Sequence, residues 1–142
     1  MLRKLAKKAK AINVKELAFQ VARANEGLIS KRVRKQLTVG ENAKGQNIGT
    51  YKSDRYARLK QNMGSQAPFK VPDLKLSGKL HKELFADIKP KGFEVGSKVD
   101  YSKYQIQRYG NEIYGLQKEA QEDIQFRNSV DIVKAYSERL GL

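Results

Sequence analysis

The chain has 142 residues and carries 29 Lys and Arg against 15 Asp and Glu, a formal net charge of +14. This length fits one domain with a modest core, and like charge of this size destabilises an isolated compact monomer while attracting nucleic acid or an acidic protein surface. The absence of Cys excludes disulfides and thiolate metal sites, and no apolar run approaches the length of a membrane span.

Charge is distributed unevenly along the chain. Residues 1–35 hold 11 basic residues and two acids, whereas residues 116–142 hold four basic and five acidic residues. One interpretation is that the basic residues simply keep the protein soluble. The asymmetry favours another, in which the two ends of the chain contact partners stacked in a fixed order.

Residues 1–12 are predicted to form a basic N-terminal arm. They show no apolar core of signal-peptide length, and they are rich in Lys rather than in the Arg and Ser of a mitochondrial presequence. Lys4, Lys7, Lys8 and Lys10 precede the first capped helix and share no apolar stripe with it. We therefore expect these four lysines to contact an acidic surface or DNA rather than the core.

The first long helix is predicted over residues 13–37. Asn13 followed by Glu16 fits an N-cap with its reciprocal acid three residues on. Gly27 weakens the middle of this helix by about 1 kcal/mol relative to Ala. Apolar residues recur along it at helical spacing, at Val14, Leu17, Ala18, Val21, Ala24, Leu28 and Val33.

Residues 38–75 are predicted to form an extended contact loop. Several Gly and Pro residues punctuate this polar segment, and only a short helix over about residues 53–61, capped by Ser53, interrupts it. A loop of this length inside a compact domain is usually functional or disordered. We favour a loop that contacts neighbouring molecules.

Short elements follow the loop. Ser77 is expected to cap a short helix that places Leu80, Leu84 and Phe85 on one side. The turn signal at residues 90–92 then predicts a β-hairpin, because apolar residues flank it on both sides.

The C-terminal part is predicted to be helical. A short helix over residues 101–108 ends at Gly110, and a second long helix covers residues 116–140. Its expected apolar face consists of Ala120, Ile124, Val130, Val133 and Leu140. The predicted fold class is therefore α+β: two long helices packed on a small antiparallel β-hairpin, with the long central loop between them, in one domain over residues 13–142.

No set of residues predicts an active site. The single histidine, His81, lies in a Lys-rich turn and is expected to be a satisfied or solvated surface residue, and one His without Cys makes no usual zinc site. Glu119, Glu122 and Asp123 lie on a predicted helix among basic residues, which favours a solvated face over paired catalytic carboxylates. We expect no enzymatic activity, no metal and no cofactor.

Tyrosines are the more informative side chains. Six of them cluster among Lys and Arg in two stretches: Tyr51, Tyr56, Tyr101, Tyr104, Tyr109 and Tyr114. Aromatic rings among basic residues can stack nucleic-acid bases, but Tyr is also enriched at protein interfaces and packs readily in cores. The sequence leaves all three interpretations open, with Tyr51, Tyr56, Tyr104 and Tyr109 as the candidate contact residues.

Six short segments, in order, resemble the Mu-type virion-morphogenesis proteins, also called tail-completion proteins. The most informative is Asp-Leu-Lys-Leu-Ser-Gly-Lys-Leu-His-Lys at residues 73–82, which is similar to their Leu, Thr or Ser, Gly, basic, Leu stretch. Tyr-Gln-Ile-Gln-Arg-Tyr-Gly at residues 104–110 resembles the turn that precedes their last helix. The other segments are residues 44–51, 55–60, 93–97 and 113–116.

This resemblance implies a non-enzymatic structural protein of a tailed-phage virion, a head–tail connector or tail-completion subunit of the neck, assembled in the host cytoplasm. It implies a homo-oligomeric ring that contacts other neck, portal or tail proteins and no membrane, with non-specific contact to packaged DNA. Gly78 is then expected to be an assembly position at which a bulky side chain clashes with a neighbouring element. The alternative is a basic nucleic-acid-binding protein of ribosomal type, which explains the charge but not the ordered segments.

Overall fold

The computed structural model describes all 142 residues, and it has the α+β class predicted from the sequence. Seven α-helices, one 3-10 helix (η1) and one antiparallel hairpin make up the chain. None of the helices is both long and apolar enough to cross a membrane. In chain order the elements are α1 Leu2–Ala11, α2 Val14–Ala24, α3 Glu26–Thr38, α4 Asp54–Asn62, α5 Lys79–Lys82, β1 Leu84–Lys89, β2 Gly92–Ser97, α6 Ser102–Tyr109, η1 Asn111–Tyr114 and α7 Lys118–Leu140.

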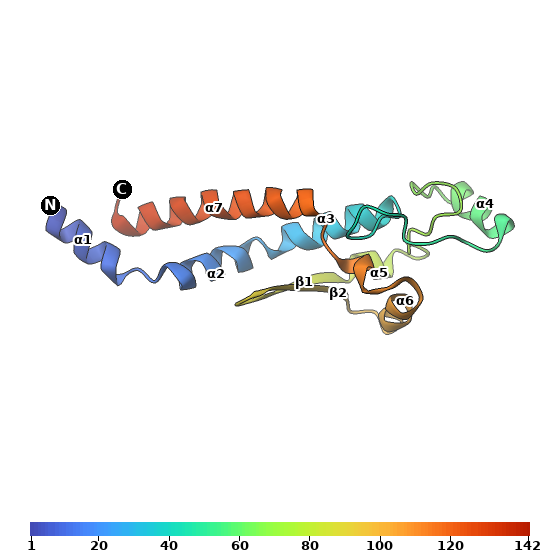
Figure 1. Cartoon of the computed structure of the whole chain (residues 1–142), viewed down its shortest axis with the longest axis horizontal. Coiled ribbons are helices and arrows are strands. Elements are labelled where there is room, and N and C mark those ends of the chain that lie inside the picture. Colours follow the sequence, from blue (N-terminus) through green and yellow to red (C-terminus); the bar gives the residue numbers. More distant parts are fainter.

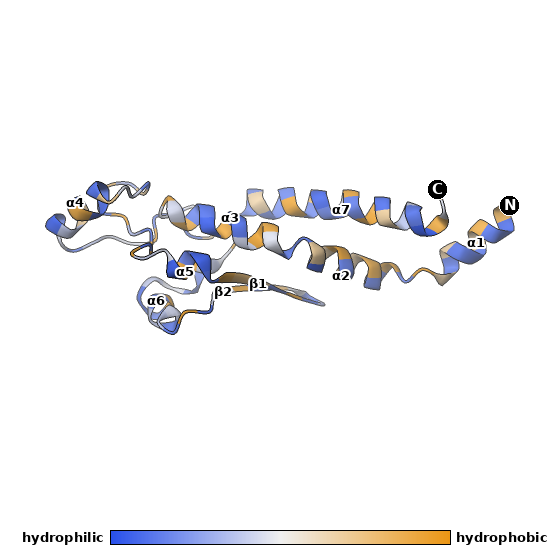
Figure 2. Cartoon of the chain, turned by 180° about the vertical axis from the view of Figure 1, so that it is seen from behind, coloured by the Kyte–Doolittle hydropathy of each residue, from blue (hydrophilic) through white to orange (hydrophobic).

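The molecule is elongated, with both termini at one end and α4 at the other (Figure 1). Helix α7 runs alongside α2 and also contacts α1 and α3, whereas strand β1 lies against α2 and α3. Helix α3 therefore occupies the middle of the molecule, between α7 and the hairpin. Hydrophilic and hydrophobic residues alternate along both α1 and α7 (Figure 2).

The predicted helix over residues 13–37 is wrong in one respect, because it is divided in two at Asn25. The start is as expected, since the backbone N–H of Glu16 donates to Oδ1 of Asn13. Asn25 leaves the helical conformation, and its side-chain amide donates to Asn128 and to Asp131 of α7, both at 2.8 Å. The division thus coincides with a contact to α7 and not with Gly27.

The predicted hairpin is confirmed. Strands β1 and β2 pair in register from Leu84 opposite Ser97 to Lys89 opposite Gly92, so that a two-residue turn of Pro90 and Lys91 joins them. The prediction that Leu84 and Phe85 continue the preceding helix is wrong, because α5 ends at Lys82 and both residues lie in β1. Side chains alternate between the faces of a strand, and accordingly Leu84 is buried whereas Phe85 is exposed.

The core is small and lies where α3, β1 and the start of α7 meet. Twelve buried residues form one cluster: Ile29, Val33, Leu37, Ile48, Leu80, Leu84, Val99, Ile113, Tyr114, Leu116, Ala120 and Ile124. The amide of Gln36 on α3 joins η1 to α7, since it donates to the carbonyl of Gly115 and accepts from the N–H of Gln117. The segment that leads into α7 is therefore fixed on α3.

Helix α7 buries only its first half. Ala120 and Ile124 belong to the core as predicted, but Val130 and Val133 do not, because they are 51% and 66% exposed. The reason is their position around the helix, because they lie about 120° and 180° from Ile124, on the side of α7 that faces away from α2 and the hairpin.

Candidate interaction surfaces

Helix α4 positions the first tyrosine pair, and its N-terminus is the one that the sequence predicts. The Ser53 hydroxyl accepts from the backbone N–H of Tyr56 at 3.2 Å, which caps the helix. The rings of Tyr51 and Tyr56 meet edge to face, with their centroids 4.9 Å apart. This arrangement is one of the two that aromatic pairs prefer.

Tyr109 joins this pair from the other half of the chain. It lies at the end of α6, and a Cβ atom added at Gly49 would lie 3.0 Å from its ring, so that Gly49 allows the close approach. Tyr51, Tyr56 and Tyr109, together with Tyr101, line one hollow with a volume of about 590 Å³. The structure thus brings together three of the four candidate tyrosines.

The hollow is also basic. Lys52, Lys75 and Arg108 line it and form no ion pair. Burial, followed by the charge of Asp73, raises the pKa of Tyr51 to about 12, and burial also raises the pKa of Tyr109. Both phenols are therefore neutral at physiological pH and can donate hydrogen bonds to an anion or to a carbonyl.

Tyr104 lies outside the hollow. Its ring is 59% exposed on α6, where the ammonium of Lys103 lies 5.1 Å from the ring centroid. The structure therefore gives Tyr104 a different environment from the other candidate tyrosines, although the sequence grouped it with Tyr109.

A buried ion pair lies at one wall of the hollow. Nζ of Lys60 on α4 is 2.9 Å from Oδ1 of Asp73, and the two side chains are 4% and 5% exposed. The Lys60 ammonium also donates to the carbonyl of Lys75, and Asp73 accepts from the Ser65 hydroxyl and from the N–H of Lys75. Burial raises the pKa of Asp73, but these hydrogen bonds, with that from Lys60 the largest, outweigh it and hold the pKa below its ordinary value.

His81 belongs to the same network. Its Nε2 lies 2.6 Å from the backbone carbonyl of Asp73, to which a protonated Nε2 donates. The expectation of a surface histidine is wrong in one respect: the ring is satisfied, but it is buried, because α5 packs it against the chain around residue 73. Burial lowers the pKa of His81, and the nearby charges of Lys75 and Arg34 act in the same direction.

Within the chain, the space around Gly78 is open, so the expected clash of a bulky side chain there stays a prediction about neighbouring subunits. A Cβ atom there would meet only Cε of Lys75, at 3.9 Å. What requires glycine is the backbone, since Gly78 has φ 83° and serves as the N-cap of α5. The predicted cap, Ser77, lies one residue earlier, and its hydroxyl accepts from the N–H of Lys79 at 3.3 Å.

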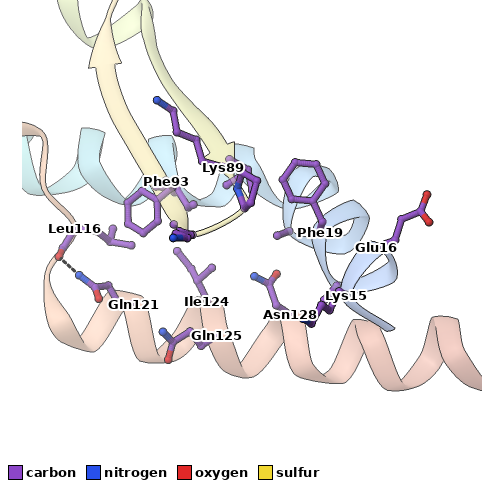
Figure 3. A pocket seen from close by; sticks show the side chains of 17 residues that line it. Lys15, Glu16, Phe19, Lys89, Phe93, Leu116, Gln121, Ile124, Gln125 and Asn128 are labelled. Atoms are coloured by element: carbon purple, nitrogen blue, oxygen red, sulfur yellow. Dashed lines mark hydrogen bonds between the residues drawn. The ribbon is translucent and has the colours of Figure 1, made fainter. Parts of the chain in front are cut away.

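A second hollow is a mainly apolar groove between α2, the hairpin tip and α7 (Figure 3), with a volume of about 860 Å³. Phe19 and Phe93 enter it from α2 and β2, and Ile124 points toward them from α7. Lys15, Lys89 and Lys91 lie at its rim together with Glu16. Lys89 is paired with Glu94 at 2.9 Å, whereas Lys15 and Lys91 form no ion pair.

The far side of α7 carries an exposed apolar stripe of Phe126, Val130 and Val133. Phe126 is 73% exposed, and the other two lie four and seven residues further on, on the same side of the helix. No element of the chain covers this stripe. The four arm lysines are exposed on α1 as well, and α1 itself contains no buried residue.

No family model, no curated protein and no solved structure matches this chain. The phage resemblance of its short segments therefore stays a prediction, and so does every role that it implies. No group of three or more His, Cys, Asp or Glu side chains lies in a position to hold a metal ion.

The groove and the buried ion pair were missed at the sequence level. Lys60 and Asp73 are 13 residues apart in a segment without periodicity, and no local pattern links them. The groove joins residues of α2, the hairpin and α7, which only tertiary packing brings together. The stripe could be recognised in the sequence, because Phe126, Val130 and Val133 recur at helical spacing. This spacing did not indicate whether that side of the helix is buried or exposed.

Proposed function

We propose that this chain is a non-enzymatic structural subunit of a tailed-phage virion, built as a ring into the neck as a head–tail connector or tail-completion protein. The observation that carries the proposal is the apolar stripe on α7, which no part of the chain covers. Contiguous exposed apolar surface in a soluble protein marks interaction sites. A surface of this kind on a small, highly charged body is what a subunit that is completed by its neighbours requires.

The placement of the six family-like segments supports the proposal. Residues 73–82 and 113–116 contribute Leu80, Ile113 and Leu116 to the core cluster, and residues 93–97 form most of β2. The segments therefore build the central body, while α1, the end of α7 and the region of α4 project from it (Figure 1). In the proposed ring, the helices packed over the hairpin form the subunit body, and residues 38–75 contact a neighbouring layer.

The basic surface has a role in the same proposal. The exposed lysines of α1 would meet an acidic neck, portal or tail protein, or the DNA that passes through the neck. Such contacts need no catalysis and no cofactor, and they form in the host cytoplasm as the virion assembles.

Deleting the gene for this chain from its phage genome tests the proposed neck function. We expect filled heads and free tails to accumulate, and a plasmid copy of the wild-type chain to restore joined particles. Mass spectrometry and cryo-electron microscopy of purified virions should find the chain at the neck. Fully infectious, joined particles in the absence of the chain would contradict the proposal.

One observation favours a second candidate, a nucleic-acid-binding protein. The hollow formed by Tyr51, Tyr56 and Tyr109 combines aromatic rings with unpaired cations, as sites for single-stranded nucleic acid do. Against it, the rings of Tyr51 and Tyr109 are partly buried and Tyr51 already contacts Tyr56, so little ring face is free for a base.

A further inference from the structure

Two uncovered surfaces of the chain are complementary in shape and in chemistry. One is the apolar groove between α2, the hairpin tip and α7, and the other is the stripe of Phe126, Val130 and Val133. The groove is a concave apolar surface, and the stripe is a convex one on a straight helix. Each lacks a partner within its own chain.

We propose that the α7 stripe of one copy of this chain lies in the groove of the next copy. Phe126 would then pack among Phe19, Ile88 and Phe93 of its neighbour. The inference rests on the ring assembly proposed above, and it names the contact that builds the ring.

Charge identifies α7 as the occupant. Relative to Phe126, the positions three, four and seven residues away on the same face are Glu119, Glu122, Asp123, Ser129, Val130 and Val133. This face therefore carries three acids and no Lys or Arg. Glu119 and Glu122 have no ion-pair partner, whereas Asp123 is paired with Arg32 of α3 at 3.3 Å. The face would approach a groove whose lining includes Lys15 and Lys91 without ion-pair partners, against one acid, Glu16.

The other exposed amphipathic helix does not fit the groove. Helix α1 carries Arg3 and four lysines and no acid, so its charge would be repelled by the lysines at the rim. A protein partner with a helix whose apolar stripe is flanked by acids would fit the same requirements. The second copy is preferred because this chain itself carries such a helix with its apolar side uncovered.

The geometry makes the contact head to tail. Ile124 points into the groove, and Phe126 lies two residues later, about 200° further around a helix of 3.6 residues per turn. The groove and the stripe therefore lie on opposite sides of α7. A contact between two different surfaces is heterologous, and it closes into a ring or extends as a filament.

A two-fold dimer in which the stripes of two copies pack on each other accounts for fewer of these surface features than the head-to-tail contact does. It would leave the groove empty, and the stripe face offers no cation opposite Glu119 and Glu122, the two of its acids that have no ion-pair partner. The head-to-tail contact covers both apolar surfaces and pairs unlike charges.

The experiment uses two full-length variants, each blocked on one surface. Phe126→Asp with Val130→Asp blocks the stripe at exposed positions, and Phe93→Asp with Lys91→Glu blocks the groove. We expect the wild type to form large assemblies by light scattering, each variant alone to associate at least about tenfold more weakly, and an equimolar mixture to stop at a dimer of one copy of each. Circular dichroism checks the folding of each variant, and Lys15→Glu with Lys91→Glu replaces the groove variant if Phe93→Asp unfolds.

Disulfide trapping gives an independent readout, because the chain has no Cys. We expect chains with Lys91→Cys and chains with Val130→Cys to link to each other on mild oxidation and to link poorly with themselves. Arg55→Cys, exposed at the far end of the molecule, is the control for random collision.

Several outcomes overturn the inference: a monomeric wild type, a mixture of blocked variants that stays monomeric, or Val130→Cys chains that link mainly with one another. A wild-type ring at the neck that survives both blocking variants would refute this contact and leave the proposed function intact. A head-to-tail dimer formed by a chain that is absent from virions would refute the function and leave the contact intact.

Discussion

Lys60 and Asp73 form an ion pair with Nζ 2.9 Å from Oδ1, and both side chains are almost completely buried. The pair joins α4, which carries Lys60, to the irregular segment before α5, which carries Asp73. Asp73 also accepts hydrogen bonds from the Ser65 hydroxyl and from the backbone N–H of Lys75. Breaking a buried pair by removing one partner leaves an uncompensated charge in the interior.

We therefore expect Lys60→Met to lower the free energy of unfolding by roughly 3–5 kcal/mol, measured by urea denaturation. The matched control is the exposed pair of Lys44 and Glu112, for which Glu112→Gln should cost less than about 1 kcal/mol. Equal costs for the two substitutions would show that the interior pair is solvated.

His81 should make stability depend on pH. Its pKa lies below the ordinary value in the folded protein, so the unfolded chain binds the proton more readily. The contribution of the neutral ring is complete above the unfolded pKa of about 6.5 and is lost as the pH falls through the folded pKa. We expect the free energy of unfolding to decrease between about pH 7 and pH 5.

The control for this prediction is His81→Gln, which keeps a side-chain donor for the carbonyl of Asp73 but does not titrate. Its unfolding free energy should vary less across the same interval. The carboxyl of Asp73 titrates at lower pH, because its own pKa is depressed, so it does not mask the comparison. Parallel curves for the two proteins would rule out His81 as the source.

Two glycines with similar backbone angles should respond differently to substitution. Gly40 and Gly78 both have positive φ, 77° and 83°. At Gly78 the space is open, so Gly78→Ala should cost only the backbone strain, about 1–2 kcal/mol. At Gly40 a Cβ atom would lie 2.5 Å from Cγ1 of Val71 and 2.9 Å from the carbonyl of Pro72, and Gly40→Ala should cost a further 1–3 kcal/mol, approximately.

Thermal or urea unfolding of both variants measures this difference. Gly78→Asn should be milder than Gly78→Ala, because Asn adopts the left-handed conformation more readily. A larger loss of unfolding free energy for Gly78→Ala than for Gly40→Ala would contradict the open space that surrounds Gly78 in the structure.

Binding of single-stranded DNA separates the two candidate functions. For a ring subunit we expect weak binding from diffuse charge, reduced when Lys4, Lys7, Lys8 and Lys10 are changed to Gln and nearly unchanged by Tyr109→Ala. If the hollow stacked bases, Tyr109→Ala would cost about 1–3 kcal/mol, or roughly 5- to 150-fold in affinity. Fluorescence anisotropy at several salt concentrations measures both, with the exposed Tyr104→Ala as the control.

Local signals made several elements predictable. The Ser53 and Asn13 caps, the turn at Pro90 and Lys91 and the helix end at Gly110 each depend on a few neighbouring residues, and the structure contains all of them. The break at Asn25 was not predictable in this way, because it coincides with hydrogen bonds to Asn128 and Asp131, more than 100 residues away.

The surfaces were predictable only in part. Basic residues around the tyrosines marked two stretches of the chain as candidate contact regions, but the sequence did not show that Tyr51 and Tyr109 lie in one hollow, and composition alone could not separate Tyr109 from Tyr104. Helical spacing placed Val130 and Val133 with Ile124 on one face, although Ile124 lies about 120° or more around the helix from the other two. Which of them is buried depends on where α2 and the hairpin pack.

The most direct measurement is cryo-electron microscopy of the purified full-length protein. We expect closed rings in which α7 of each subunit lies in the groove between α2 and the hairpin of the next, with Phe126 beside Phe93. A population of single, separate molecules at all concentrations, or a two-fold dimer joined stripe to stripe, would contradict this expectation.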